Sequence, residues 1–316
     1  MFFVVKSFND DAGGLLVPLV VVGPSTTANR STDGGVTWSS VTLPDNARTD
    51  IAYGAGRFVT IGAGLKTSYS DDDGATWSTG GDMTASKSWY KLGFSSTLGS
   101  GSGRFIAINN NATDTVGNYS DDGGETWTAF TLPATVGSAR GGPLWNGSGF
   151  CIVINGTAYT SADGLTWSAG GAIGAAVDGK GVYDFINDEF VYPSTGGTNA
   201  ISRRSTDAAS WSASTTILSS TWCYGAIMPD GALLGFTASG NDNTGASADG
   251  GDNYSTGDIG IAGNWPMTCS GISFVAVSGT ESKISVDGAT WVAGGATSSI
   301  AWVAMGAARA QQTAPL

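Results

Sequence analysis

One short phrase recurs seven times along this sequence, and it constrains the fold more than any other feature. Each copy begins Ser-x-Asp, continues through small residues and ends on an aromatic residue six or seven positions after the serine. Successive aromatic residues of the phrase lie 37 to 50 residues apart. A repeat of this length cannot bury a hydrophobic face alone and stacks against its neighbours. The chain is therefore expected to consist of seven similar units.

The copies carry the same kinds of residue at their key positions, and we call each copy a Ser–Asp turn. The defining residues are Ser31, Asp33, Gly35 and Trp38; Ser70, Asp72, Gly74 and Trp77; Ser120, Asp122, Gly124 and Trp127; Ser161, Asp163 and Trp167; Ser205, Asp207 and Trp211; Ser247, Asp249, Gly251 and Tyr254; and Ser285, Asp287 and Trp291.

Each phrase has the chemistry of a tight hairpin turn. Serine and aspartate side chains hydrogen-bond nearby backbone, and glycine supplies a positive φ that other residues resist. The aromatic residue begins the next strand and packs over the hairpin. The fifth copy has Ala208 in place of glycine and the sixth has Tyr254 in place of tryptophan, so both turns are expected to persist with less regular geometry.

The segments between the phrases indicate strands. A typical one, residues 51–62, reads as an apolar strand, a glycine-rich turn and a second apolar strand, and no segment shows helical periodicity. Each unit therefore contains four strands. The predicted fold is all-β, a seven-bladed β-propeller of four-stranded antiparallel blades with the Ser–Asp turns as hairpins.

The whole chain, residues 1–316, is expected to form one propeller domain. An apolar segment at about 300–306 follows the last turn and could pair with a strand around residues 15–22, closing the ring and removing its open edges. Residues 307–316 would then be a tail. The alternative is that residues 2–6 form the first strand and the C-terminus is an extra arm.

The pattern S-x-D-x-G-x-x-W resembles the Asp-box, or BNR repeat, found in sialidases, sortilin-type receptors, some glycoside hydrolases and a photosystem assembly factor. In that family the box joins the third and fourth strands of a blade and lies away from the active site. The resemblance implies a propeller fold and says little about activity.

Sialidase activity is not expected. The sialidase signature includes an Arg-Ile-Pro motif, which is absent here, and a Tyr–Glu nucleophilic pair. The glutamates of this chain are Glu125, Glu189 and Glu281, and the first lies inside a Ser–Asp turn. Other glycosidases need two carboxylates about 5–9.5 Å apart, which the sequence does not identify. We therefore predict no catalytic residues.

The acidity of the chain comes from the repeat. The turns hold 12 of the 26 acidic residues and none of the 14 basic ones, so the remaining acids and bases balance and the net charge of −12 belongs to the turns. This distribution excludes nucleic acid as a partner, because such binding needs a basic footprint. Asp71–Asp73 could recruit Ca²⁺, but a solvated turn is the favoured interpretation.

No metal site or cofactor is expected. The chain has no histidine, and Cys151, Cys223 and Cys269 lie far apart without metal-ligand spacing, so they are interpreted as free thiols. The longest apolar run, residues 15–23, contains Pro18 and is too short to span a bilayer. The N-terminus lacks the features of a secretory signal.

Five tryptophans lie outside the phrases, near the predicted innermost strands. Packing between blades is one interpretation. The other is an aromatic platform for sugars at one mouth of the ring, with Trp89, Tyr90 and Lys91 as the best cluster. The candidate ligand-binding residues are Trp89, Tyr90, Lys91, Trp145, Trp222, Trp265 and Trp302.

The composition favours a structural or binding role over an enzyme. A Gly-, Ser-, Thr- and Ala-rich chain without a signal or a catalytic constellation resembles a phage virion protein. We predict a protein of a tail fibre or capsid surface that contacts other virion proteins and adsorbs to host-surface glycans. The alternatives are a carbohydrate-active enzyme and an intracellular assembly scaffold, with extracellular or cytoplasmic location in place of the virion surface.

Overall fold

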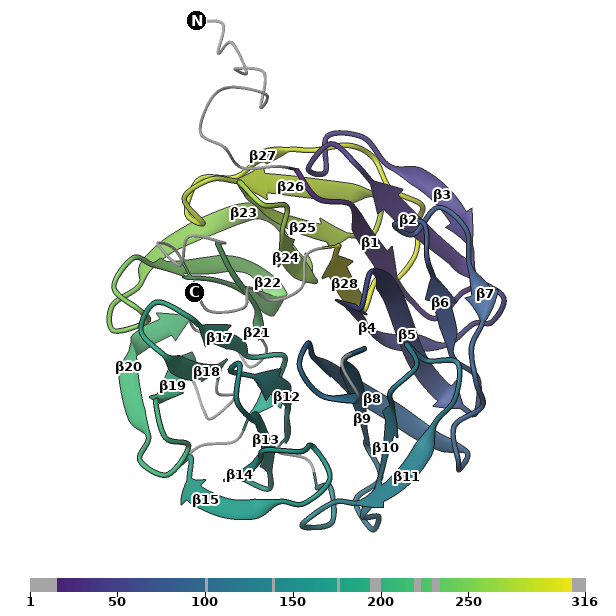
Figure 1. The fold of residues 1–316 in the computed structure, drawn as a ribbon. Coiled ribbons are helices and arrows are strands. Elements are labelled where there is room, and N and C mark those ends of the chain that lie inside the picture. The colour runs from purple at the N-terminus through teal and green to yellow at the C-terminus, as the bar shows by residue number, and fades with distance from the viewer. Residues whose placement is uncertain are drawn as a thin grey trace, which may run out of the picture.

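The computed structural model describes residues 16–99, 102–137, 140–174, 177–193, 200–218, 223–228 and 234–308 of the 316-residue chain. All regular elements in these ranges are β-strands, arranged in sheets around a common centre (Figure 1). In the described residues, no helix of the length and apolarity required to cross a membrane is present.

The first sheet joins strands from the two ends of the chain. Its order is β28-β1-β2-β3, with the strands β28 (Ala304–Ala307), β1 (Leu19–Val22), β2 (Thr27–Ser31) and β3 (Ser39–Thr42). The C-terminal strand expected near residues 300–306 is therefore observed at β28, where it pairs antiparallel with β1. The alternative first strand, residues 2–6, lies outside the described residues.

The next two strand sets have the same up-and-down order and meet in one eight-stranded sheet through pairing of β5 with β8. The strands of the first set are β4 (Arg48–Gly54), β5 (Arg57–Gly64), β6 (Ser68–Ser70) and β7 (Ser78–Thr79). Those of the second set are β8 (Lys87–Ser95), β9 (Arg104–Asn109), β10 (Val116–Ser120) and β11 (Thr128–Thr131).

The remaining sheets continue the pattern. They contain β12 (Arg140–Trp145), β13 (Phe150–Ile154), β14 (Thr157–Ser161) and β15 (Ser168–Ala172), with β16 (Asp178–Gly179) parallel to β12; then β17 (Val182–Asp184), β18 (Glu189–Pro193), β19 (Ala200–Ser205) and β20 (Ser212–Leu218). The last strands are β21 (Cys223–Ile227), β22 (Leu234–Ser247) and β23 (Ser255–Asn264), followed by β24 (Met267–Cys269), β25 (Phe274–Ser278), β26 (Glu281–Ser285) and β27 (Val292–Ala293).

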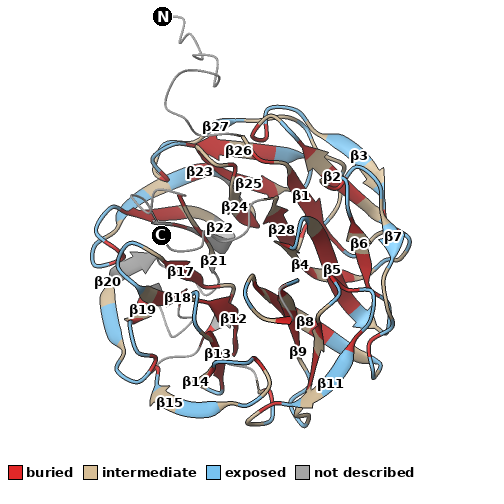
Figure 2. Ribbon diagram, in the orientation of Figure 1, coloured by how far each residue is buried: buried red, intermediate tan, exposed pale blue. Residues whose placement is uncertain are grey.

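The sheets are the blades of a β-propeller built from four-stranded units. The innermost strands contact one another in the order β4, β8, β12, β17, β21, β24, β28 and back to β4. Blades pack face to face through apolar side chains; Phe58 of β5 faces the first sheet, whereas Val59 and Ile61 face the sheet that contains Trp89. Outer strands such as β3, β7 and β11 are short, polar and exposed, which suits unpaired edges (Figure 2).

The Ser–Asp turns have one hydrogen-bond scheme throughout. In all seven, the serine Oγ donates to the aspartate Oδ1 at 2.7–3.0 Å. The same carboxylate accepts backbone N–H groups from the far side of the turn, as Asp72 does from Thr76. Ala208 adopts the positive φ of 55° that glycine adopts in the related turns, and Asp207 accepts from Ala209 and Ser210. The fifth turn is therefore as complete as the fourth, contrary to the expectation of irregularity.

Candidate functional site

The turn carboxylates are held by internal hydrogen bonds. The side-chain and backbone bonds from Thr76 lower the pKa of Asp72 to about 2, and the backbone of Asn253 helps to lower that of Asp249 to about 2. Both groups are therefore ionised at neutral pH and committed to closing their turns. An acid with this role has no proton to donate in catalysis.

Arginines connect the turns of neighbouring blades. Arg57 binds Asp71 of its own blade at 2.6 Å and reaches Glu125 in the next turn at 2.9 Å. Arg104 binds Asp121 and donates to the carbonyl oxygen of Asp163 in the following turn. The turns therefore lie on one side of the ring, which we call the turn face. Four arginines contact turns of the next blade there, Arg30, Arg57, Arg104 and Arg204, and they offset part of its acidity.

Several acids that could act as metal ligands or catalytic groups are paired with other groups of the protein. Asp71 is bound by Arg57 and Asp72 by its own turn, so the pair does not form an open Ca²⁺ site. No group of three or more metal-ligating side chains occurs among the described residues. Each glutamate contacts a base: Glu125 contacts Arg57, Glu189 contacts Arg204 and Glu281 contacts Lys283.

The tryptophans of the expected sugar platform are buried and divided between the two faces. Trp89, Trp265 and Trp302 lie at the blade ends opposite the turns, with exposures of 0%, 1% and 3%. Trp145 pairs with Phe150 at the turn end and is 5% exposed. These four indoles pack in the cores and present no joint stacking surface, as the interpretation by blade packing requires. Trp222 lies outside the described residues.

Tyr90 and Lys91 lie at a β-bulge on the face opposite the turns. The register of β8 against β9 shifts between Trp89 and Lys91, which re-aims the side chains there. The Lys91 ammonium lies 4.2 Å from the centre of the Tyr90 ring, and the Arg140 guanidinium lies 4.7 Å from it. The tyrosine ring is therefore engaged by two cations, an arrangement worth about 0.5–2 kcal/mol per contact.

Three consecutive inner strands carry irregularities at this face. Besides the bulge in β8, register shifts occur in β4 between Arg48 and Asp50 and in β12 between Gly141 and Leu144. The described pairings of β17, β21 and β24 with their neighbours show no shift. Bulges concentrate next to functional sites because they redirect side chains from the regular pleat. The sector formed by β4, β8 and β12 is therefore the specialised part of the ring.

A lysine that follows β16, the strand paired with β12, also contacts this sector. Lys180, between β16 and β17, donates to the Asp50 carboxylate at 3.1 Å and to the carbonyl oxygen of Ile51 at 2.9 Å. Asp50 is 3% exposed and also accepts the backbone N–H groups of Ile51 and Leu92. The contact joins residues 130 positions apart and ties three blades together.

We call Asp50, Tyr90, Lys91, Arg140 and Lys180 the mouth cluster. It gathers three cationic side chains in a chain whose net charge is −12. Sequence reasoning identified Tyr90 and Lys91 but missed the other three members. Their proximity depends on ring closure and bulges, and no local pattern signals it. The chemistry of the cluster suits recognition of an anionic group.

Comparisons with known proteins yield similarity of structure alone. No family model matches the chain, and no curated protein matches its sequence. A functionally unknown protein from Desulfotomaculum acetoxidans has a TM-score of 0.64 at 8% identity, covering 89% of this chain and 99% of that one. YCF48 bound to D1 peptide has a TM-score of 0.57 at 16% identity, covering 81% and 85%. Virginiamycin B lyase from Staphylococcus aureus has a TM-score of 0.61 at 12% identity, covering 84% and 92%.

The chain has a β-propeller fold. Identities this low support the fold and nothing finer, and the similar structures include a peptide complex and a lyase. Propellers host unrelated activities, so function has to be argued from the site.

Proposed function

We propose that this chain is a non-enzymatic, seven-bladed propeller of the Asp-box family that binds acidic glycans at the mouth cluster. The count of seven blades is supported by seven Ser–Asp turns at blade spacing. The observation that carries the binding role is the gathering of Lys91, Arg140 and Lys180 at one mouth of a strongly acidic protein. The Lys180 side chain is 31% exposed, whereas Lys91 and Arg140 are each 9% exposed, so a carboxylate on a sugar would meet the Lys180 ammonium first.

In the part of the chain that the structure describes, the pairing of the glutamates with bases supports binding over hydrolysis. The glutamates are paired with bases, and the best-formed aspartates close turns. At the mouth, Asp50 is the carboxylate of the cluster, and it is engaged by two backbone N–H groups and Lys180. A carboxylate held in this way serves to position the strands, because it has no free face for a substrate.

The role that fits such a module is adsorption of a phage-like particle to its host. The Gly-, Ser-, Thr- and Ala-rich composition supports a place on a tail fibre or capsid surface, beside other virion proteins. Mass spectrometry of purified particles tests this placement directly. The protein is expected in assembled particles at a fixed ratio to capsid protein, and its absence from them would refute the virion role.

A glycan array tests the binding role. Glycans that carry uronate or sialate groups are expected to bind, and their neutral counterparts are expected to bind at least tenfold more weakly. The double variant Lys91→Gln, Arg140→Gln should lose the acidic signal. Lys180→Gln removes a side chain that is 31% exposed and should weaken binding; because it also takes the ammonium from the buried Asp50, thermal melting checks that the variant stays folded.

The matched control is Lys66→Gln, which removes a lysine paired with Asp82 on the exposed surface outside the mouth cluster. It should leave binding unchanged. Equal binding of neutral and acidic glycans, or full binding by the Lys180 variant, would refute the assignment. Release of product from a fluorogenic glycoside panel would refute the non-enzymatic role.

A further inference from the structure

A groove with uncharged walls lies on the same face as the mouth cluster, where the β24–β27 sheet meets the first sheet. Its volume is about 360 Å³, and it is lined by Ser278, Gly279, Ser299, Ile300, Ala301 and Trp302. We call it the seam groove. Its walls come from the turn between β25 and β26 and from the segment that leads into β28. It therefore follows the seam at which the last described strands of the chain join the first sheet.

The walls of the seam groove are fixed to each other by the protein. Gly279 and Ile300 form an antiparallel bridge, and the Trp302 indole N–H donates to the Gly279 carbonyl oxygen at 2.9 Å. Thr297 donates its hydroxyl to the same carbonyl oxygen at 2.9 Å. A groove with walls held in this way is formed before a ligand arrives, so little ordering entropy opposes binding.

The lining has the chemistry of a site for a neutral hydroxylated ring. None of the six lining residues carries a charge. The hydroxyls of Ser278 and Ser299 can donate and accept, whereas the partly exposed Ile300 and the exposed Ala301 supply apolar surface; Trp302 is only 3% exposed. The exposed lining is more polar than apolar, which suits a hydroxylated ligand, and the volume lies in the range of small-molecule pockets, which begins at about 300 Å³.

We propose that the seam groove binds a neutral saccharide, one pyranose unit at a time. Hydroxyls at the rim of the sugar bond Ser278 and Ser299, and an apolar face of the ring lies against Ile300. This site is separate from the mouth cluster and does not depend on the function proposed for that cluster. A ligand bound to both walls also holds the ring closed, because one wall belongs to the β24–β27 sheet and the other leads into β28.

The test is saturation-transfer NMR with glucose, galactose, mannose and N-acetylglucosamine, with glycerol as a small polyol. At least one of the sugars is expected to give a signal that glycerol at equal concentration does not compete away. Ser299→Tyr fills the groove from an exposed position and should weaken binding at least tenfold. Ser78→Tyr, an exposed serine on outer strand β7, is the matched control and should leave binding unchanged.

The seam site predicts a second signal in thermal unfolding. The sugar that binds should raise the melting temperature of the wild type and of Ser78→Tyr, but not that of Ser299→Tyr. Lys91→Gln with Arg140→Gln should keep the neutral sugar, and Ser299→Tyr should keep acidic glycans, so the two sites fail separately. Absence of a signal from all four sugars, competition by glycerol, or binding that survives Ser299→Tyr would overturn the proposal.

Discussion

Two boundaries between neighbouring blades hold the ring by different means. The polar boundary lies between the β4–β7 and β8–β11 strand sets, where Arg57 reaches Glu125. The Thr67 hydroxyl donates to the Gly81 carbonyl oxygen of its own blade at 2.9 Å. The Trp127 indole N–H donates to the same hydroxyl at 3.4 Å. Side chains of one blade therefore reach polar groups of the next along the turn face.

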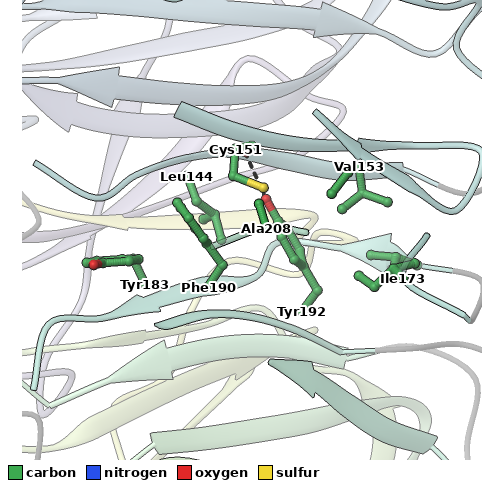
Figure 3. Close-up of a cluster of buried hydrophobic side chains, with 10 residues drawn as sticks. Leu144, Cys151, Val153, Ile173, Tyr183, Phe190, Tyr192 and Ala208 are labelled. Carbon is green, nitrogen blue, oxygen red and sulfur yellow. Dashed lines mark hydrogen bonds between the residues drawn. The ribbon is translucent and has the colours of Figure 1, made fainter. Parts of the chain in front are cut away.

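The aromatic boundary lies between the β12–β15 and β17–β20 sheets and lacks these clamps. Gly149 stands where Arg57 does, directly before the phenylalanine of the second strand, and Ala158 stands where Thr67 does. The buried Tyr192 of β18 instead inserts among apolar side chains of the opposite sheet (Figure 3). Its hydroxyl contacts the carbonyl oxygens of Gly142 at 3.0 Å and Cys151 at 2.9 Å.

One backbone contact is common to both boundaries. The Gly81 N–H donates to the Gly124 carbonyl oxygen, and the Gly171 N–H donates to the Ala208 carbonyl oxygen, both at 2.9 Å. The repeat thus has a constant main-chain bridge and a variable side-chain complement. We infer that similar blades can be joined in two ways without changing the geometry of the ring. One is the set of side-chain contacts of Arg57 and Thr67, which we call the polar rim. The other is the buried ring of Tyr192, which we call the aromatic wedge.

The largest difference between the two boundaries is expected when the Tyr192 ring is removed. Tyr192→Ala deletes a fully buried ring and should cost about 3–5 kcal/mol of unfolding free energy, because the cavity cannot collapse. Tyr192→Phe removes only the hydroxyl and should cost about 1 kcal/mol. Denaturant unfolding followed by tryptophan fluorescence measures both. The matched change at the polar boundary is Tyr69→Ala, a half-buried ring beneath Arg57, and it should cost less than half as much. Equal losses would remove the distinction.

The backbone hydrogen bond common to both boundaries should not tolerate a side chain on its donor glycine. A Cβ atom at Gly171 would lie 1.7 Å from the Ala209 carbonyl oxygen, and one at Gly81 would lie 2.3 Å from the Glu125 carbonyl oxygen. Each alanine variant should lose about 1–3 kcal/mol, with Gly171→Ala the larger loss. Gly149→Ala is the control, since its nearest contact would be 3.2 Å, and thermal melts should place it near the wild type. A tolerated Gly171→Ala would show that the backbones can separate freely.

The sequence predicts the repeating part of this molecule and not the specialised part. The serine, aspartate and aromatic positions encode the turns locally, so their spacing sufficed to predict strands, hairpins and a propeller. The aromatic wedge has no such signal, because Tyr192 meets Cys151 only after two blades pack. The same holds for Lys180 and Asp50 in the mouth cluster. The non-turn tryptophans were recognisable, but the sequence left open whether they pack between blades or form a sugar platform, and the structure buries Trp89, Trp145, Trp265 and Trp302.

Acid should weaken the turn face while the wedge persists. The pKa of Asp72 is about 2 in the folded protein, lowered by hydrogen bonds from Thr76, and near 4 when unfolded. Its contribution to stability is therefore complete above about pH 4 and is lost as the pH falls through about 2. Hydrogen exchange at pH 5 and pH 2.5 should show a larger loss of protection for the Thr76 amide, which donates to the Asp72 carboxylate, than for the Gly171 amide, which donates to a backbone carbonyl oxygen. Asp72→Asn should flatten the pH dependence, and an equal loss at both amides would contradict the comparison.

The smallest expected effect concerns the ion pairs of Arg57 with Asp71 and Glu125. Arg57→Met keeps much of the apolar stem over Tyr69 but removes the contacts with Asp71 and Glu125. Both carboxylates are more than half exposed, so the loss should be only about 0.5–1 kcal/mol at low salt and smaller at 1 M salt, where screening is strong. Urea unfolding at the two salt concentrations measures the difference.

The reciprocal change tests whether the contacts of Arg57 can be added to the aromatic boundary, where Tyr192 already packs. Gly149→Arg with Thr160→Tyr copies the Arg57–Tyr69 pair onto the aromatic boundary, where the next turn offers backbone carbonyls but no counterpart of Glu125. Stability should therefore rise by less than the Arg57→Met variant loses, and the gain should depend little on salt. A larger gain that depends on salt would mean that the stabilising effects of the polar rim and the aromatic wedge add. The boundary between β15 and β17 would then be less stable than it could be, and the aromatic wedge would not be a full substitute for the polar rim.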